Sequence, residues 1–347
     1  MIAGEPDISL FVAFEHDFSA GRYYDPGFGV DVEWDVPLRD GYESRLLAEC
    51  DARHLIKTAD AVWVHGWATP ALRAIIDGAH AAGRPVLMRG ENWSGAMPNG
   101  PWPRSWLKNI YLGRIFARCR AFLAVGSRNR AYYEAHGVAP DRIFEMPYAV
   151  DNDFFTSRAT AAAAADVRAR HDIPDDRKIV LYAGKLTARK HADHLLAAWQ
   201  QAQWVGHARP VLLIVGDGEL RARLEREADS GVIFAGFRNQ SEMPGYYAAA
   251  DLFVLMSERE PWGLAVNEAM ACGTGVVASD QVGAAHDLVD DTTGARLPVG
   301  DVTRLAHALP DLLQRSESLG RAARARIAGW DFAADIIGLK AALDATL

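Results

Sequence analysis

The 347-residue sequence has few cysteines and no long apolar run, and both absences narrow what the protein can be. Its three cysteines, Cys50, Cys119 and Cys272, are far apart and lack the spacing of a zinc site or a disulfide framework. No stretch approaches the roughly 18 apolar residues of a membrane-spanning helix, and the N-terminus lacks the basic and apolar regions of an export signal. These features predict a cytoplasmic protein in a reducing compartment.

The sequence also has fewer basic than acidic residues, 37 against 45. The formal net charge of -8 argues against a protein whose whole surface binds nucleic acid, and no nucleic-acid partner is expected. Half of the residues are hydrophobic, which is enough for a large core. Since domains usually hold about 100 to 200 residues, the length predicts two of them.

Short apolar runs alternate with segments long enough for a helix. The runs are residues 8–14, 61–65, 84–89 and 121–126 in the first half, and 179–184, 210–216, 232–236, 251–256 and 275–279 in the second. This alternation predicts an α/β protein in which two doubly wound domains, each with a buried parallel sheet, face each other across a cleft.

The strand pattern is interrupted by an alanine-rich stretch at residues 156–176. We place the domain boundary near Phe155, which gives a first domain over residues 1–155 and a second over 156–328. The alanine-rich stretch could be a flexible linker, but alanine is the best helix former, so a short connecting helix is expected.

Two lysines follow the predicted strand 179–184, which ends at Gly184. Lys185 and Lys190 would lie at the carboxyl end of a buried strand, where two cations suit a diphosphate. The alternative is that both are solvated surface lysines. The segment is not a P-loop, because the Gly-x-x-x-x-Gly-Lys-Ser/Thr order is absent.

Two glutamates flank a Pro-Trp-Gly turn after the predicted strand 251–256. Glu260 would lie in the loop and Glu268 about one turn into the following helix, which Gly273 would end. Backbone amides at the helix start, around Gly263 and Leu264, can bind an anion. Because carboxylates accept hydrogen bonds from hydroxyls, this arrangement suits a diphosphate with hydroxyl-rich groups at both ends, as in a nucleotide sugar.

Several segments together resemble one enzyme family. "EREPWGLAVNEAMACG" resembles the E-x7-E segment of retaining glycosyltransferases of the GT-B fold, family four in particular. The similarity extends to "YAGKLTARKH", "LLIVGDGELRARLE", "VIFAGFRNQSEMPGYYAAADLFVL", "VGAAHDLVDDTTGARLP" and "PYAVDNDFF". It implies two Rossmann-like domains, with the donor bound by residues 156–328. The final segment, about 329–347, resembles the helix that crosses back to complete the acceptor-binding first domain.

The resemblance implies a role for each matching position. Glu268 would bind the ribose hydroxyls of the nucleotide, and Glu260 would hold hydroxyls of the donor sugar. Lys185 and Lys190 would neutralise the leaving diphosphate; Lys185 stands where the family more often has arginine, whose planar fork it lacks. The other positions expected at the donor site are Gly21, Gly184, Phe237, Arg238, Trp262, Gly263 and Leu264. For Phe237 an ordinary core position is an equal alternative.

The resemblance further implies transfer of a hexose with retention of configuration, from a UDP- or GDP-sugar to a glycan or lipid-linked acceptor, in polysaccharide or glycolipid biosynthesis. Neither a metal nor another cofactor is expected, and Asp151-Asn152-Asp153, which mimics a metal motif, is interpreted as a structural hinge. The alternatives are an inverting enzyme with His16 as its base and a related nucleotide-sugar epimerase. A non-enzymatic sugar-binding protein would need an export signal.

The first half departs most from the family pattern. Many relatives have a histidine where this chain has Arg89, Gly90 and Glu91, so Glu91 is a candidate for that catalytic position. His65 follows another predicted strand and is a second candidate. For each histidine the alternative is a purely structural role.

One segment of the acidic chain is basic. Residues 104–120 contain five basic residues and no acidic one. At about 100° per residue, Arg104, Lys108, Arg114 and Arg118 share one helix face with Leu107 and Tyr111. This face could meet an anionic lipid acceptor or the inner face of the cell membrane, giving peripheral association there. The alternative is a solvated helix face.

Overall fold

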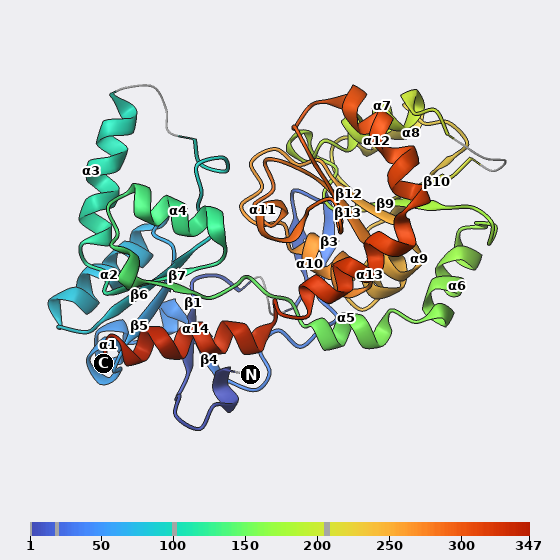
Figure 1. Ribbon diagram of the computed structural model, residues 1–347. Coiled ribbons are helices and arrows are strands. Elements are labelled where there is room, and N and C mark those ends of the chain that lie inside the picture. Colours follow the sequence, from blue (N-terminus) through green and yellow to red (C-terminus); the bar gives the residue numbers. More distant parts are fainter. Residues whose placement is uncertain (1, 18–20, 99–102, 205–208) are drawn as a thin grey trace. The chain divides into compact units, whose positions relative to one another are not determined.

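The computed structural model describes residues 2–17, 21–98, 103–204 and 209–347. Contacts divide the chain into two compact units (Figure 1). The first contains Met1–Ala20, Pro37–Tyr148 and Phe332–Leu347, and the second contains Gly21–Val36 and Ala149–Asp331. The second unit therefore includes an early segment, residues 21–36, that the predicted division into 1–155 and 156–328 assigned to the first domain. No helix among the described residues is long and apolar enough to cross a membrane.

The second unit is built on a parallel sheet of six strands. These are β9 (Ile179–Ala183), β10 (Val211–Val215), β11 (Val232–Gly236), β12 (Leu252–Leu255), β13 (Gly275–Ser279) and β14 (Gly294–Leu297). The first five confirm the predicted runs, whereas β14 was not predicted. The order is β11-β10-β9-β12-β13-β14, the order of a doubly wound nucleotide-binding sheet. The strand order reverses between β9 and β12, and ligands bind beyond the carboxyl ends of strands at such a point.

Helices cover the six-stranded sheet of the second unit (Figure 1). They are α5 (Asn152–Arg158), α6 (Ala161–Arg170), α7 (Ala192–Gln201), α8 (Arg221–Glu227), α9 (Met243–Ala249), α10 (Leu264–Ala271), α11 (Ala285–Leu288), α12 (Val302–Gln314) and α13 (Ser316–Ile327). The alanine-rich stretch forms α6, as predicted; Thr160 caps it by accepting a hydrogen bond from the Ala163 amide, and α6 packs against α9.

The Asp151-Asn152-Asp153 segment forms helix-end and tertiary contacts. Asp151 caps α5, since its carboxylate accepts the Phe154 amide at 2.8 Å. The Asn152 amide donates to the carbonyls of Ile327 at 3.0 Å and Trp330 at 3.3 Å. These bonds tie the start of α5 to the end of α13, which favours a structural role for the segment.

The first unit contains a four-stranded parallel sheet in sequence order. Its strands are β5 (Val62–His65), β6 (Val86–Gly90), β7 (Ala121–Ala124) and β8 (Ile143–Glu145), with α1 (Ala52–Thr58), α2 (Pro70–Ala81), α3 (Arg104–Phe116) and α4 (Ser127–Ala135). The predicted strand at residues 8–14 is β1 (Phe11–Phe14), which pairs in parallel with β4 (Glu43–Leu46) in a separate two-stranded sheet. None of the four β1 residues is fully buried, so its prediction as a buried strand was wrong.

The C-terminal helix α14 (Phe332–Asp344) completes the first unit, as predicted. It packs against β7 and β8, and Leu339 and Ala342 join the core around Leu123. Gly338 allows this close approach, because a Cβ atom there would lie 1.8 Å from the carbonyl oxygen of Glu145.

The early segment of the second unit is an antiparallel hairpin. Its strands are β2 (Tyr23–Asp25) and β3 (Val30–Val32). The side-chain amide of Asn239 donates to the Glu33 carbonyl at 2.5 Å, and the Ser241 amide donates to the Asp35 carboxylate at 3.1 Å. These bonds hold the hairpin next to the loop that follows β11.

Candidate donor site

The site is built where the strand order of the second unit reverses. β9 leads into Gly184 and Lys185, and β12 leads into the loop that carries Glu260. The Gly184 amide donates to the Val215 carbonyl at 3.0 Å, which extends the sheet by one bond. A Cβ atom at Gly216 would lie 1.9 Å from the Gly184 carbonyl oxygen, so the ends of β9 and β10 approach closely. The two loops therefore leave the same edge of one rigid sheet.

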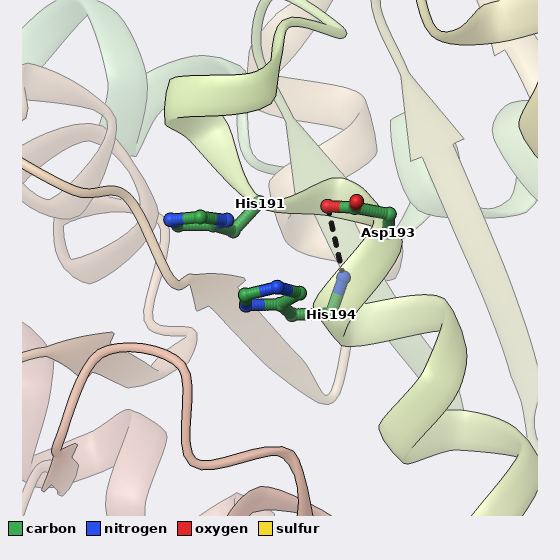
Figure 2. Close-up of side chains that lie close together, drawn as sticks. All are labelled: His191, Asp193 and His194. Carbon is green, nitrogen blue, oxygen red and sulfur yellow. Dashed lines mark hydrogen bonds between the residues drawn. The ribbon is translucent and has the colours of Figure 1, made fainter.

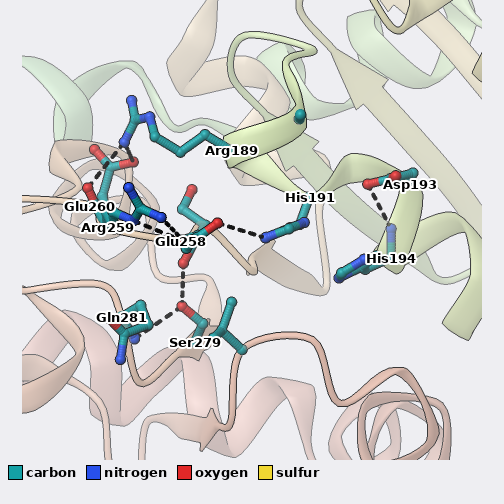
Figure 3. Close-up of polar contacts among 12 residues, drawn as sticks. Arg189, His191, Asp193, His194, Glu258, Arg259, Glu260, Ser279 and Gln281 are labelled. Carbon is teal, nitrogen blue, oxygen red and sulfur yellow. Dashed lines mark hydrogen bonds and ion pairs between the residues drawn. The ribbon is translucent and has the colours of Figure 1, made fainter. Parts of the chain in front are cut away.

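Lys190 and Glu260 are joined across these loops. The Lys190 ammonium forms an ion pair with the Glu260 carboxylate, and both side chains are largely buried. The Arg189 guanidinium lies 3.5 Å from the same carboxylate and donates to the Arg259 carbonyl at 3.1 Å (Figure 3). The Glu260 amide also donates to the Gln281 carbonyl at 2.9 Å. Glu260 thus lies between the cations Lys190, which was predicted for the donor site, and Arg189, which was not.

Lys185 has a partner that sequence reasoning missed. Its ammonium lies 2.9 Å from both carboxylate oxygens of Asp25 in the hairpin and 5.0 Å from the centre of the Phe28 ring. The amides of Gly27 and Phe28 also donate to Asp25. Although burial opposes it, these hydrogen bonds lower the pKa of Asp25, which is therefore charged at neutral pH. The Asp-Pro-Gly sequence predicts a turn, but not its partner 160 residues away.

Glu268 lies on α10, about one turn from its start, as predicted. The phenol of Tyr247 donates to one carboxylate oxygen at 2.7 Å, and the amide of Gln240 donates to the other at 3.2 Å. Burial raises the pKa of Glu268, although both hydrogen bonds oppose the shift. Gly263, which precedes the helix, has a φ of 98°, and a Cβ atom there would lie 2.9 Å from Val282. Leu264 is the first residue of α10.

The comparisons with known proteins address the same unit. Residues 164–327 match the family of glycosyl transferases group 1. Residues 164–327, which lie in the second unit, belong to this family. The chain is 37% identical over 175 residues to a GDP-mannose-dependent alpha-mannosyltransferase of Mycobacterium tuberculosis, covering 50% of this chain and 44% of the relative. It is 32% identical over 217 residues to a D-inositol 3-phosphate glycosyltransferase of Xylanimonas cellulosilytica, covering 57% and 51%. It thus spans about half the length of these curated relatives.

Solved structures agree on the fold. The Anabaena protein Alr3699/HepE, solved in complex with UDP and glucose, superposes with a TM-score of 0.66 at 18% identity, over 84% of this chain and 81% of that one. Sucrose-phosphate synthase from Thermosynechococcus elongatus superposes with a TM-score of 0.65 at 20% identity, over 95% and 86%. The fold of the chain is therefore GT-B, as predicted.

The remaining predicted donor residues occupy different environments. The Phe237 ring meets the Phe28 ring edge-on at 5.0 Å, and Arg238 lies 4.0 Å from Glu242. Gly21 has a φ of 85° where the hairpin segment begins. The side chain of Trp262 is buried, donates to Asn267 at 2.9 Å and stacks on Trp330. These contacts favour a structural role for the Trp262 ring over contact with a donor.

The predicted catalytic candidates of the first unit lie after β5 and β6. The His65 ring stacks on the Trp63 ring, with the ring centroids 5.0 Å apart. Desolvation and the positive charge of Arg89 lower the pKa of His65, so its imidazole is neutral at pH 7. Arg89 itself is buried and forms an ion pair of 3.2 Å with Asp335 of α14. Glu91 is hydrogen-bonded to Tyr148. Burial is the main cause of the raised pKa of the Tyr148 phenol, and the negative charge of Glu91 raises it further.

Helix α3 carries the predicted basic face. Four large apolar side chains on it are exposed: Trp106, Leu107, Ile110 and Tyr111. A pocket of about 160 Å³ lies between α2 and α3, and its polar lining is Arg73, Asp77, Tyr111, Arg114 and Arg118. Arg118 was predicted on the helix face but lies two residues beyond the helix end, where it forms an ion pair of 3.0 Å with Asp77. Arg104 is the first residue of the helix, and Lys108 donates to the Met97 carbonyl at 3.0 Å.

Proposed function

We propose that the protein is a retaining glycosyltransferase that transfers a hexose-type sugar from a UDP- or GDP-sugar to a glycan or lipid-linked acceptor. The proposal depends mainly on one observation. The loop after β9 carries Lys185 and Lys190, and the loop after β12 carries Glu260. The strand order reverses between these two strands, and Glu268 lies on α10, the helix that follows β12. Two cations and two carboxylates at this place match the charges and hydroxyls of a nucleotide sugar.

The catalytic role of the lysines follows from charge. When the glycosidic bond of the donor breaks, negative charge develops on the diphosphate, and a positioned ammonium stabilises it. In the free protein Lys190 is paired with Glu260 and Lys185 with Asp25. A bound diphosphate would therefore replace Glu260 as the partner of Lys190 and Asp25 as the partner of Lys185. Glu260, released from Lys190, could then accept hydrogen bonds from sugar hydroxyls.

The donor and the setting are proposed from the relatives. The mycobacterial relative is named for GDP-mannose, and the Anabaena structure contains UDP and glucose. GDP-mannose and UDP-glucose are therefore the first donors to test. Another relative, from Rhizobium meliloti, is named for lipopolysaccharide core biosynthesis, which supports a role in glycolipid or polysaccharide assembly.

Calorimetric titration with GDP and UDP, each with and without a chelator, tests the donor site. We expect one nucleotide to bind in the presence of the chelator and the Glu268→Ala variant to lose most of this affinity. Absence of binding by either nucleotide would refute the proposal. Turnover of the bound donor then excludes a sugar-binding protein without activity, and an epimerised sugar product would identify an epimerase instead.

The acceptor side is proposed to include α3. Exposed Trp106 and Leu107 lie beside Arg104 and Lys108 on this helix, a combination that suits contact with an anionic membrane surface. Co-sedimentation with vesicles tests this part. We expect binding to vesicles that contain phosphatidylglycerol, weaker binding to phosphatidylcholine alone, and a loss in a Trp106→Ser, Leu107→Ser variant. Equal sedimentation with both vesicle types would contradict it.

A further inference from the structure

Three potential metal ligands lie together at the start of α7, next to the donor residues. They are His191, Asp193 and His194, all partly buried (Figure 2). One ligand atom from each lies within 4.8 Å of the others. Across the described ranges of the chain, no other group of three or more histidine, cysteine, aspartate or glutamate side chains meets this criterion.

The backbone at His191 has an uncommon conformation. Its φ of 52° and ψ of 39° are left-handed, a region that costs free energy for any residue with a Cβ atom and favours glycine. Among non-glycine residues of the described chain, only Asp172 and Arg259 share a positive φ. Non-glycine residues in this conformation are frequent at ligand sites, where the surroundings hold them in place. Backbone preference therefore does not explain a histidine at position 191, whereas a ligand-binding role does.

The neighbouring side chains leave ligand capacity unused. Nδ1 of His194 is buried and has no hydrogen-bond partner among the described residues, an arrangement that is rare for a polar atom. Asp193 accepts the His194 amide at 3.1 Å and the Arg223 guanidinium at 2.7 Å, one on each carboxylate oxygen. Since each oxygen has more than one acceptor position, the carboxylate can also bind a cation.

A second carboxylate lies beside the cluster. Glu258, in the loop after β12, lies 3.8 Å from Nε2 of His191 (Figure 3). The Glu258 amide donates to the Arg189 carbonyl at 2.8 Å, which ties this loop to the turn that carries Lys190. The Glu258 carboxylate is therefore held near His191, one of the three potential ligands.

We propose that His191, Asp193 and His194 bind a divalent transition-metal ion of the Zn²⁺ type, with Glu258 as a fourth ligand. Two imidazoles and carboxylate oxygens are a usual ligand set for Zn²⁺, whereas Mg²⁺ and Ca²⁺ prefer oxygen ligands alone. The two imidazole rings are stacked, with centroids 4.1 Å apart and planes 11° apart. Because ligand lone pairs lie in the ring planes, one ring turns out of the stack when the ion binds.

The bound ion has a structural effect and takes no part in sugar transfer. His191 directly follows Lys190, and Glu258 lies two residues before Glu260. An ion bound by His191 and Glu258 therefore links the two loops that also carry the Lys190–Glu260 ion pair. This cross-link restricts their separation.

Calorimetric titration with ZnCl₂ near neutral pH tests the site, using the full chain without a histidine affinity tag, chelator or nucleotide. The variants are His191→Gly and His194→Gln. His191→Gly suits the left-handed backbone, so its loss of binding reports the missing ligand and not misfolding. The control is His307→Ala, which removes an exposed histidine from α12 of the same unit. A Cys50→Ser control tests whether the partly exposed thiol binds the ion.

We expect about one Zn²⁺ ion to bind to the wild-type protein and to both controls. Each histidine variant should bind it at least about tenfold more weakly. Zn²⁺ should also raise the Tm of the wild-type protein but not of His194→Gln. Absence of binding, unchanged affinity in His191→Gly, or an equal loss in His307→Ala would overturn the proposal. Nucleotides are absent from this experiment, so its outcome is independent of the proposed donor site.

Discussion

Replacement of Glu268 by glutamine separates nucleotide binding from folding. Glutamine keeps the side-chain shape but loses the charge and one acceptor oxygen. If Glu268 accepts hydrogen bonds from the ribose hydroxyls, the variant loses charge-assisted bonds worth about 1.5–3 kcal/mol. At about 1.4 kcal/mol per factor of ten, calorimetry should find the nucleotide bound about 10- to 150-fold more weakly. The free variant should have a raised Tm, because burial penalises the charged carboxylate and raises its pKa.

Two controls make the Glu268 prediction specific. The wild-type protein should discriminate against the 2′-deoxynucleotide, and the Glu268→Gln variant should not. The pH dependence has a defined sign: the folded-state pKa of Glu268 is raised, so the native state binds the proton more tightly than the unfolded state. Wild-type stability should therefore fall as pH rises from the ordinary pKa of glutamate to the raised one, while nucleotide affinity increases. A change below threefold in nucleotide affinity, or unchanged deoxynucleotide discrimination in the variant, would refute the assignment.

Three further substitutions test neighbouring parts of the account. Asp25→Asn keeps an oxygen that accepts the hydrogen bond of the hairpin turn but removes the ion pair with Lys185. Because this partly exposed ion pair competes with the diphosphate for Lys185, calorimetry should find the nucleotide diphosphate bound about two- to fivefold more tightly in the variant. Arg89→Met leaves the Asp335 carboxylate buried without its cation and should lower the free energy of unfolding by about 3–5 kcal/mol in denaturant titration. Gly338→Ala forces a Cβ atom against β8 and should cost about 1–3 kcal/mol, seen as a lower Tm.

Each of these substitutions has a matched control. Asp31→Asn, at an exposed carboxylate of the same hairpin, should leave nucleotide affinity unchanged, and weaker binding by the Asp25 variant would contradict the competition with phosphate. Adding Asp335→Asn to the Arg89 variant should restore part of the stability, because it removes the unpaired charge. Gly329→Ala, where a Cβ atom meets open space, should leave the Tm unchanged. An equal Tm for both glycine variants would show that α14 does not pack closely on β8.

The second unit was predictable because its signals are local. Five of its six strands are short apolar runs. The loops that follow β9, β11 and β12 carry most of the residues assigned to the donor, with Gly21 as the exception. β14, with the sequence Gly-Ala-Arg-Leu, has two residues that are not fully buried and too little apolar character to be recognised. The place of Glu268 followed from the helix that begins after Gly263.

The partners of the predicted residues could not be predicted, because they come from distant parts of the chain. Nothing in the spacing of the sequence links Asp25 to Lys185 or Arg89 to Asp335. Trp262 was assigned to the donor site by its motif position, but its ring is buried against Trp330, a contact that only the tertiary structure reveals. The His191 conformation was equally hidden, since the sequence there predicts no left-handed residue.

The measurement that tests the central claim most directly is the configuration of the first sugar released from a donor. Proton NMR can follow the anomeric signals of mannose from GDP-mannose, or of glucose from UDP-glucose, while the protein hydrolyses the donor with water in place of the acceptor. Both donors are α-linked, so a retaining glycosyltransferase should release the α-anomer first, before mutarotation, and the Lys190→Ala variant should release it more slowly. Initial release of the β-anomer, or no turnover of either donor together with no nucleotide binding, would contradict the account.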